Sequence, residues 1–530
     1  MEEIEQAQTT TDLVSKLIQV LQIERGSWKF TLLTAIPITL VSIFYVQYIM
    51  QVWGIYGFSF DDSWIHVQYA RTIFEGRPWE YAWGIPSTGS SGPLWSVVLS
   101  PIFLFGSSHD AIVTSVLTVS GIMFIVDTFL VGEIVRQHTD RWQYAVFGQI
   151  IFVLVPRNAG LMLSGMETPL GMMMLLLALL VLPRPEWQYD IVLGVVVGFA
   201  YLCRPEFVLI AALCLPLRSL IMLYRDTNKK RRFLTLAAMF AIAVLVVLPW
   251  VLHCYNTTGL PMPDSYYSKL RWGVNQEMID LWNYFWFVAW FPSEPYLALS
   301  FVGGGALLVL KRRPYELIMI TSLYALYRLT MPSMAFLFAA RYLVPLFNIM
   351  AIAFVCGFVL IIERILTLRS LKDPFPVDFR ILLTIMMIFI LFTPSAVSSI
   401  QYVDHHANQA KNIEEMQVHL SNWIVENVPE DATIATYDVG AIGYFAHGTV
   451  LDLYGLVTPI VLHNLTGLND IAEYLREVNC TYIMFYVEWF VGYHVALISE
   501  GATVTELYRV TLTDPVVVGT PNMAVYQIEW

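Results

Sequence analysis

Charged residues are scarce in this 530-residue chain, because Asp, Glu, Lys and Arg together make up only 14% of it. A soluble globular chain carries roughly 25% charged residues, so a soluble fold, a disordered chain and a coiled coil are excluded. Cysteine is also scarce, and five cysteines in the whole chain exclude a secreted domain held together by disulfides. Lys and Arg number 30 against 42 Asp and Glu, and this net charge of −12 offers no broad basic face for nucleic acid.

Apolar residues are abundant and make up 57% of the chain. About 20 apolar residues in a helix cross roughly 30 Å of hydrocarbon, which predicts an all-α polytopic membrane helix bundle of about eleven spans. The predicted spans are 29–51, 110–135, 142–156, 168–183, 190–203, 206–224, 233–255, 295–310, 315–330, 334–362 and 381–402.

The last part of the chain is different, since residues 403–530 hold 16 acidic residues against three basic ones. A helical stretch at 407–427 and β-branched runs at 432–437, 481–486 and 523–528 predict a small α/β domain. Three parts are therefore expected: an N-terminal segment 1–28, a membrane domain 29–402, and a soluble C-terminal domain 403–530. Cys480 is the one cysteine of the tail, so a structural disulfide is not expected.

Lys and Arg counts predict the orientation, because short cytoplasmic loops are enriched in these residues. With a cytoplasmic N-terminus, that side collects 18 of them against eight on the opposite side. The C-terminal domain is then extracytoplasmic. The first outer loop, 52–109, is long, and within it 63–75 is amphipathic and is expected to lie along the bilayer surface. Residues 93–105 are expected to form an interfacial or re-entrant helix.

Ionisable residues gather at the outer ends of the predicted spans, where a long loop on a rigid scaffold is a common place for function. They are expected to converge on one pocket: Asp61, Asp62, His66, Arg71, Glu167, Arg204, Glu206, His253, Asp264, Lys269, Arg271 and Arg341. Tyr266 lies in the same region, within a stretch of prolines and aromatics from His253 to Lys269.

Asp61 and Asp62 are adjacent carboxylates directly before the amphipathic stretch. Such a pair suits proton abstraction or metal binding, so one carboxylate is expected to act as general base while the other, with Glu167, holds a divalent cation. The alternative is that the two acids only cap the helix that follows them.

Arg204 and Arg341 are expected near the outer headgroup level, and Lys269 belongs to an outer loop. Guanidinium groups bind phosphate through two parallel hydrogen bonds, and a rigid turn at Gly259–Pro263 directs Lys269, so a phosphate site is expected. The alternatives are that these arginines extend to lipid headgroups or pair with Glu206, and that Tyr266 belongs to an interfacial aromatic belt. In the tail, the glycines of the segment 438–443 predict a strand-to-helix turn rather than a dinucleotide loop.

The motifs resemble those of the GT-C superfamily, membrane glycosyltransferases similar to the arabinofuranosyl and mannosyl transferases that use polyprenyl-phosphate sugars. The likeness covers roughly 29–455, and its most specific parts are 61–71, 90–95, 165–168, 204–206, 259–269 and 341–345. The resemblance implies Asp61 as catalytic base and Arg204, Lys269 and Arg341 as ligands of the lipid phosphate. It also implies that Asp62 and Glu167 bind a divalent cation (Mg²⁺, Mn²⁺ or Ca²⁺) or position the acceptor. Apart from the resemblance, His66, Arg71, Glu206, His253 and Tyr266 are expected to line the acceptor site or the pocket.

The expected function is inverting transfer of a sugar from a polyprenyl-phosphate donor to a hydroxyl of a glycan, lipid or protein acceptor at the extracytoplasmic face. The competing hypothesis is a transporter or flippase of lipid or polysaccharide, for which ionisable groups in the middle of the spans are typical. Asp127 and Glu133 are the main acids inside a predicted span, whereas most ionisable groups gather at one end. This placement favours an enzyme.

Overall fold

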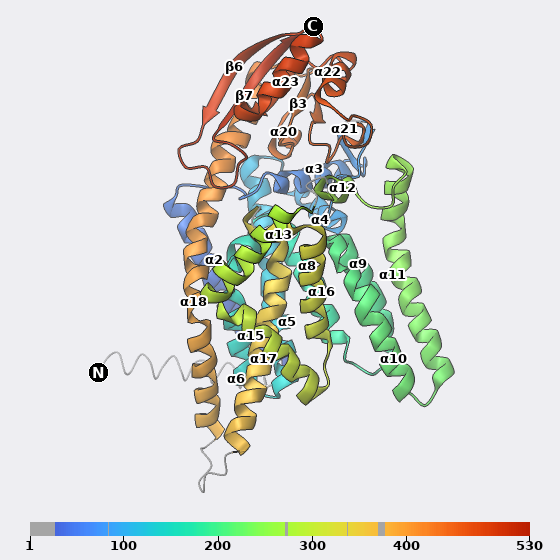
Figure 1. Ribbon diagram of the computed structural model, residues 1–530, viewed down its shortest axis with the longest axis vertical. Helices are drawn as coiled ribbons and strands as arrows, with labels where there is room; N and C mark the ends of the chain where they lie inside the picture. Colours follow the sequence, from blue (N-terminus) through green and yellow to red (C-terminus); the bar gives the residue numbers. More distant parts are fainter. Residues whose placement is uncertain (1–26, 83, 271–273, 336–337, 369–376) are drawn as a thin grey trace, which may run out of the picture.

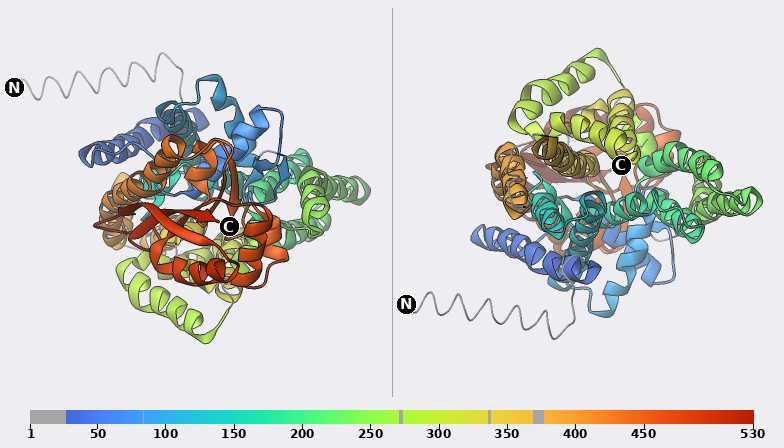
Figure 2. Two further views of the ribbon diagram at one scale, coloured as in Figure 1. Left: turned by 90° about the horizontal axis from the view of Figure 1, so that it is seen from above. Right: turned by 90° about the horizontal axis from the view of Figure 1, so that it is seen from below.

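Long, roughly parallel helices form a bundle, and a smaller sheet domain is seated on one end of it (Figure 1). The structure is a computed structural model that describes residues 27–82, 84–270, 274–335, 338–368 and 377–530. Residues 1–26 of the predicted N-terminal segment and Arg271 lie outside the described residues. Viewed along the bundle, the sheet domain covers the middle of the helix ends (Figure 2).

Six helical runs in the described residues are long and apolar enough to cross a membrane: Trp28–Val52 (α2), His109–Thr139 (α5), Pro205–Arg225 (η2, η3 and α10), Lys229–Thr258 (α11), Ala340–Leu366 (mostly α17) and Asp378–Asn427 (α18 to α19). A bent pair, Gln276–Ser293 and Pro295–Lys311 (α15), makes a seventh if its two arms form one span. Shorter apolar helices are α6 (Trp142–Val153), α8 (Thr168–Val181) and α9 (Gln188–Cys203).

Each of the eleven predicted spans overlaps one or more helices, including the 16-residue α16 (Tyr315–Thr330), and residues 336–337 of the span 334–362 lie outside the described residues. The polytopic helical bundle is therefore confirmed, whereas the number of eleven crossings is not, since several of these helices are shorter than a full span. Local capping residues set several helix ends. Ser27 and Ser108 cap α2 and α5 through their side-chain oxygens, and Gly259 ends α11 in the left-handed conformation.

The first outer loop forms a layer between the bundle and the sheet domain. It contains α3 (Asp62–Phe74), the short strands β1 (Glu80–Ala82) and β2 (Ile85–Pro86), α4 (Pro93–Leu99) and η1 (Ser100–Leu104). Both predicted helices are thus present. However, α3 is buried on most sides, from Ser63 to Ala70, because α20 (Gly440–Phe445) of the sheet domain packs on it. The prediction that 63–75 lies along a bilayer surface is wrong, because amphipathic residues also suit a helix between two protein layers.

The C-terminal domain is an α/β domain with a five-stranded sheet in the order β4-β3-β5-β7-β6. The predicted strands correspond to β3 (Thr433–Thr436), β5 (Tyr482–Tyr486) and β7 (Asn522–Glu529), and β4 (Thr449–Asp452) and β6 (Thr503–Thr511) complete the sheet. β3, β4 and β5 are parallel, and β7 and β6 add on in antiparallel register.

The helix that leaves the bundle enters this domain without a break. α18 (Val377–Ile413) continues through the π-helical turn η7 (Glu414–Val418) into α19 (His419–Asn427), so the predicted boundary at 402 falls inside one helical run. All five cysteines are buried and free, and Cys480 lies in the core of the sheet domain. This rigid connection brings the ends of β3 and β5 over the first outer loop.

Candidate active site

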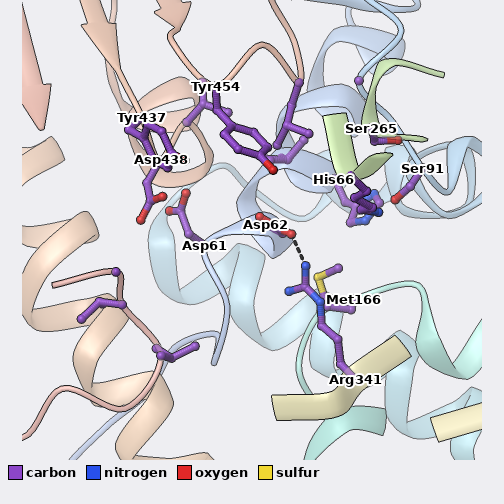
Figure 3. A pocket seen from close by; sticks show the side chains of 18 of the residues that line it. Asp61, Asp62, His66, Ser91, Met166, Ser265, Arg341, Tyr437, Asp438 and Tyr454 are labelled. Atoms are coloured by element: carbon purple, nitrogen blue, oxygen red, sulfur yellow. Dashed lines mark hydrogen bonds and ion pairs between the residues drawn. The ribbon is translucent and has the colours of Figure 1, made fainter. Parts of the chain in front are cut away.

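A cavity of about 450 Å³ lies between the helix bundle and the C-terminal domain. The bundle side contributes residues from the first outer loop, α12 (Asp264–Leu270) and η6 (Phe338–Leu343), and the other side comes from the ends of β3, β4 and β5 (Figure 3). Of the predicted site residues, the cavity brings together Asp61, Asp62, His66, Lys269 and Arg341.

Asp61 lies at the start of α3, and its carboxylate is held by the C-terminal domain. Its two oxygens accept hydrogen bonds from the backbone N–H groups of Gly440 and Ala441, at 2.6 and 2.8 Å. A Cβ atom on Gly440 would lie 2.0 Å from the Asp61 carbonyl oxygen, so only glycine permits this approach. The geometry fixes one side of the carboxylate, and each oxygen keeps a lone pair available to another donor.

Asp438 faces Asp61 across the cavity, and Figure 3 shows the two carboxylates turned toward each other. Asp438 follows β3 and accepts hydrogen bonds from Gln417 Nε2 at 2.9 Å and from the Tyr486 hydroxyl. Burial raises the pKa of Asp61 well above its ordinary value, and the negative charge of Asp438 raises it further. Burial also raises the pKa of Asp438. Both carboxyl groups therefore keep a proton to a higher pH than an exposed aspartate does.

Asp62 begins α3 and pairs with Arg341, as the dashed line in Figure 3 marks. The Arg341 side chain is 5% exposed, lies over the Phe60 ring at 4.7 Å and donates to the Tyr342 hydroxyl at 3.0 Å. A guanidinium group held by a carboxylate and by aromatic faces is fixed in one orientation. It is therefore a preorganised positive charge on the bundle side of the cavity.

Glu167 joins the first outer loop to the loop after α9. It contacts His66 Nε2 at 3.2 Å and Arg204 Nη1 at 3.7 Å, and all three side chains are buried. Arg204 Nε also donates to Glu206 at 2.7 Å, and Glu206 accepts a hydrogen bond from the Tyr327 hydroxyl at 2.8 Å. This chain of ion pairs positions His66 at the wall of the cavity.

A second cavity, of about 170 Å³, adjoins the first. The two share Ser91, Ser265, Lys269 and Tyr342 as lining residues, so Lys269 lies at the passage between them. The second cavity also contains the predicted residues Glu167, Arg204, Glu206 and Tyr266, together with apolar side chains of Val208, Met262, Leu326 and Met331. It combines cations with an apolar lining.

Three predicted pocket residues do not line either cavity: Arg71, His253 and Asp264, whose carboxylate contacts His463 Nε2 at 2.7 Å. Arg71 donates to the Tyr444 carbonyl at 2.8 Å and lies over the Tyr444 ring, so it attaches α20 to α3. His253 contacts the Ser87 carbonyl at 3.0 Å and stacks on Trp250. Arg71 and His253 stabilise the layer that carries Asp61 and Ser91.

The predicted metal ligands Asp62 and Glu167 each have a cationic or histidine partner. Asp62 pairs with Arg341, and Glu167 pairs with His66 and Arg204. Within the described residues, no group of three or more His, Cys, Asp or Glu side chains is arranged to hold a metal ion. The donor set in this arrangement does not fit a divalent cation, because the arginines already neutralise the carboxylates. No step of the proposed reaction therefore depends on a metal ion at Asp62 and Glu167.

Sequence reasoning missed the contribution of the C-terminal domain. Tyr437, Asp438, Tyr454 and Trp489 line the cavity from more than 360 residues further along the chain than Asp61. The interpretation of 438–443 as a strand-to-helix turn is confirmed, since β3 leads into α20 there. The signal in the sequence was the glycine pair: a Cβ on Gly440 or Gly443 would overlap Asp61 or Tyr81 of the first outer loop.

Solved structures share this fold. The crystal structure of ArnT from Cupriavidus metallidurans bound to undecaprenyl phosphate aligns with a TM-score of 0.58 at 11% identity, over 94% of this chain and 97% of that one. The chain has the GT-C fold. The oligosaccharyltransferase AglB from Archaeoglobus fulgidus, in complex with an inhibitory peptide and a dolichol-phosphate, aligns at 0.52 and 13% identity, covering 87% of this chain and 70% of that one.

A third structure with the GT-C fold is longer. The mycobacterial arabinofuranosyltransferase AftD has a TM-score of 0.50 at 14% identity, and the match covers 94% of this chain but 41% of AftD. By sequence, residues 410–526 match a family described as a domain of unknown function, DUF8728, and no curated protein matches. The GT-C fold thus extends over nearly the whole chain, and the sequence family covers its C-terminal domain.

Proposed function

We propose that this protein is a membrane glycosyltransferase that moves a sugar from a polyprenyl-phosphate carrier to an acceptor hydroxyl. The observation that carries the proposal is the cavity itself, which Asp61 lines together with the cations Lys269 and Arg341. Structures with this fold were solved with undecaprenyl phosphate and with dolichol-phosphate, which supports a lipid-phosphate donor. The carboxylates and cations also line a cavity at one end of the bundle, which favours transfer over transport through the bundle.

In the proposed reaction, Asp61 accepts the proton of the acceptor hydroxyl. The hydroxyl oxygen forms a bond to the anomeric carbon from the side opposite the phosphate, while the bond from that carbon to the phosphate oxygen breaks. The electron pair of that bond remains on the polyprenyl phosphate, which leaves, and the configuration at the sugar inverts. A base with a raised pKa suits this step, since general bases work best with a pKa near the working pH.

Negative charge grows on the leaving phosphate, and the two cations of the bundle side face the site where it would form. Arg341 is fixed by Asp62 and Tyr342, so it would stabilise that charge without reorganising. Lys269 lies over the Tyr342 ring at 4.6 Å, between the two cavities. The apolar lining of the second cavity suits the first isoprenoid units of the carrier. With the C-terminal domain extracytoplasmic, as the charge distribution predicts, transfer occurs at the outer face.

The test is a transfer assay with the purified full-length protein in lipid nanodiscs, using synthetic polyprenyl-phosphate mannose, glucose and arabinose as donors. Lys269→Met is expected to raise the donor KM about 10- to 100-fold, since a hydrogen bond to a charged group contributes about 1.5–3 kcal/mol. Lys311→Met is the matched control, because Lys311 pairs with Asp140 away from both cavities. No release of polyprenyl phosphate from any donor would contradict the proposal.

Replacing Asp438 is expected to change the pH dependence of transfer. Asp61 must be unprotonated to act as base, so kcat/KM falls as the pH drops through its pKa. Asp438→Asn removes a neighbouring negative charge and lowers the pKa of Asp61, which shifts the acid limb of the profile to lower pH. The pH profile of kcat/KM measures this shift, and Asp431→Asn, at an exposed position of the same domain, serves as control. An acid limb that stays in place would contradict the coupling.

A further inference from the structure

The wall of the cavity that comes from the C-terminal domain is rich in aromatic rings. Tyr437 packs edge-on against Tyr454 and Trp489, with ring centroids 5.2 and 5.3 Å apart, and Trp489 also contacts Tyr486 at 4.9 Å. These residues come from the end of β3, the loop after β4, and the junction where β5 runs directly into α23 (Val487–Ser499). Three segments of the domain thus meet at one aromatic surface.

Trp489 combines exposure with a fixed position. It is 42% exposed although it lines the cavity, and its ring lies against Gly519 of the loop before β7. A Cβ atom at position 519 would lie 2.3 Å from the ring, so glycine is needed for this contact. A large apolar ring that is both held and exposed is typical of a binding surface.

The charges of the two cavity walls differ. Among the described lining residues, the cations Lys269 and Arg341 belong to the bundle side, whereas the C-terminal domain contributes tyrosine, tryptophan, valine, leucine and glycine side chains with Asp438. Such a wall offers hydrogen-bond acceptors and hydroxyls beside aromatic faces, and it offers no positive charge. It complements a ligand that has hydroxyl donors and apolar C–H faces and carries no phosphate or carboxylate.

Saccharides have this chemistry, because the C–H groups on one face of a sugar ring contact aromatic faces while its hydroxyls donate to carboxylates. We infer that the aromatic wall formed by Tyr437, Tyr454 and Trp489 is the acceptor subsite and that its ligand is a neutral saccharide. This inference rests on the proposed function. The donor sugar is linked to phosphate and so lies on the cationic side, which leaves the aromatic wall for the acceptor. The nucleophilic hydroxyl then points toward Asp61.

The experiment measures binding separately from transfer. Saturation-transfer NMR on the full-length protein in nanodiscs uses methyl α-mannopyranoside, methyl β-galactopyranoside and methyl α-arabinofuranoside as neutral probes. Glucosamine 1-phosphate and an Asn-Val-Thr peptide serve as the anionic and peptide probes. At least one neutral glycoside is expected to give a signal that falls at least fivefold in Trp489→Ala. Trp423→Ala is the matched control, because Trp423 stacks on Tyr508 outside the cavity.

Transfer kinetics provide the second readout. Trp489→Ala is expected to raise the acceptor KM at least tenfold while the donor KM changes less than twofold, and Trp489→Phe is expected to restore most of the difference. Binding of only the peptide or only the phosphorylated sugar would overturn the inference, as would an unchanged acceptor KM in Trp489→Ala. Saccharide binding without any transfer would support the subsite and contradict the proposed function, so the two failures are distinguishable.

Discussion

Asp61→Asn is expected to lower kcat by about 10²- to 10⁴-fold, the range that a positioned general base contributes. The carboxamide has one acceptor oxygen, so it retains one of the two hydrogen bonds from the Gly440 and Ala441 amides and cannot take the acceptor proton. Donor binding is expected to change little, since the proposed phosphate ligands are Lys269 and Arg341. Single-turnover transfer from a synthetic polyprenyl-phosphate sugar measures the chemical step.

Two controls separate the loss of the base from a loss of folding. Asp110→Asn changes a surface carboxylate on α5 that is 83% exposed, and it is expected to keep full activity. The thermal unfolding midpoint of Asp61→Asn shows whether α20 stays docked on α3. The residual activity of the variant should also lack the acid limb that Asp61 causes in the wild-type profile. A folded Asp61→Asn protein that retains more than a tenth of the wild-type kcat would rule out Asp61 as the base.

The bundle side of the fold could be predicted from the sequence because the physical signals are local. Eleven apolar runs identify eleven helices, and Ser27, Ser108 and Gly259 mark helix ends where capping rules place them. Charged residues are rare in this chain, so the ionisable residues that gather at one end of the spans also indicate that their side chains meet in one site. The structure does bring Asp61, Asp62, His66, Lys269 and Arg341 to one cavity.

The other wall could not be predicted, since it depends on how two domains dock. Asp438 reaches Asp61 because α18 to α19 form one continuous helical run, and because glycines 440 and 443 let α20 approach the first outer loop closely. The sequence shows those glycines but not their partners. The sequence likewise does not show that Arg71 donates to the carbonyl of Tyr444. A residue that joins the two domains was therefore predicted to belong to the pocket.

Arg341→Met is expected to lower kcat by about 10²- to 10³-fold, the cost of removing one preorganised group that stabilises charge in the transition state. Methionine has a similar length and keeps contact with Phe60, but it leaves Asp62 without the guanidinium. Transfer rates therefore fall for two reasons in this variant: the phosphate loses a cation, and an uncompensated carboxylate lies beside it. Arg328→Met, at a position outside both cavities, is the control.

The double variant Asp62→Asn with Arg341→Met separates these two reasons. If Arg341 acts on the phosphate, the double variant stays much slower than Asp62→Asn alone, because neutralising Asp62 removes the uncompensated carboxylate but does not replace the missing cation. Recovery to the rate of Asp62→Asn alone would mean that Arg341 only neutralises Asp62, and the proposed role at the phosphate would be wrong. Whichever role Arg341 has, the effects of the two substitutions on the activation free energy are expected to be non-additive, because Asp62 and Arg341 are in direct contact. The transfer rate of the double variant, and not the non-additivity, therefore decides whether Arg341 stabilises the phosphate or only neutralises Asp62.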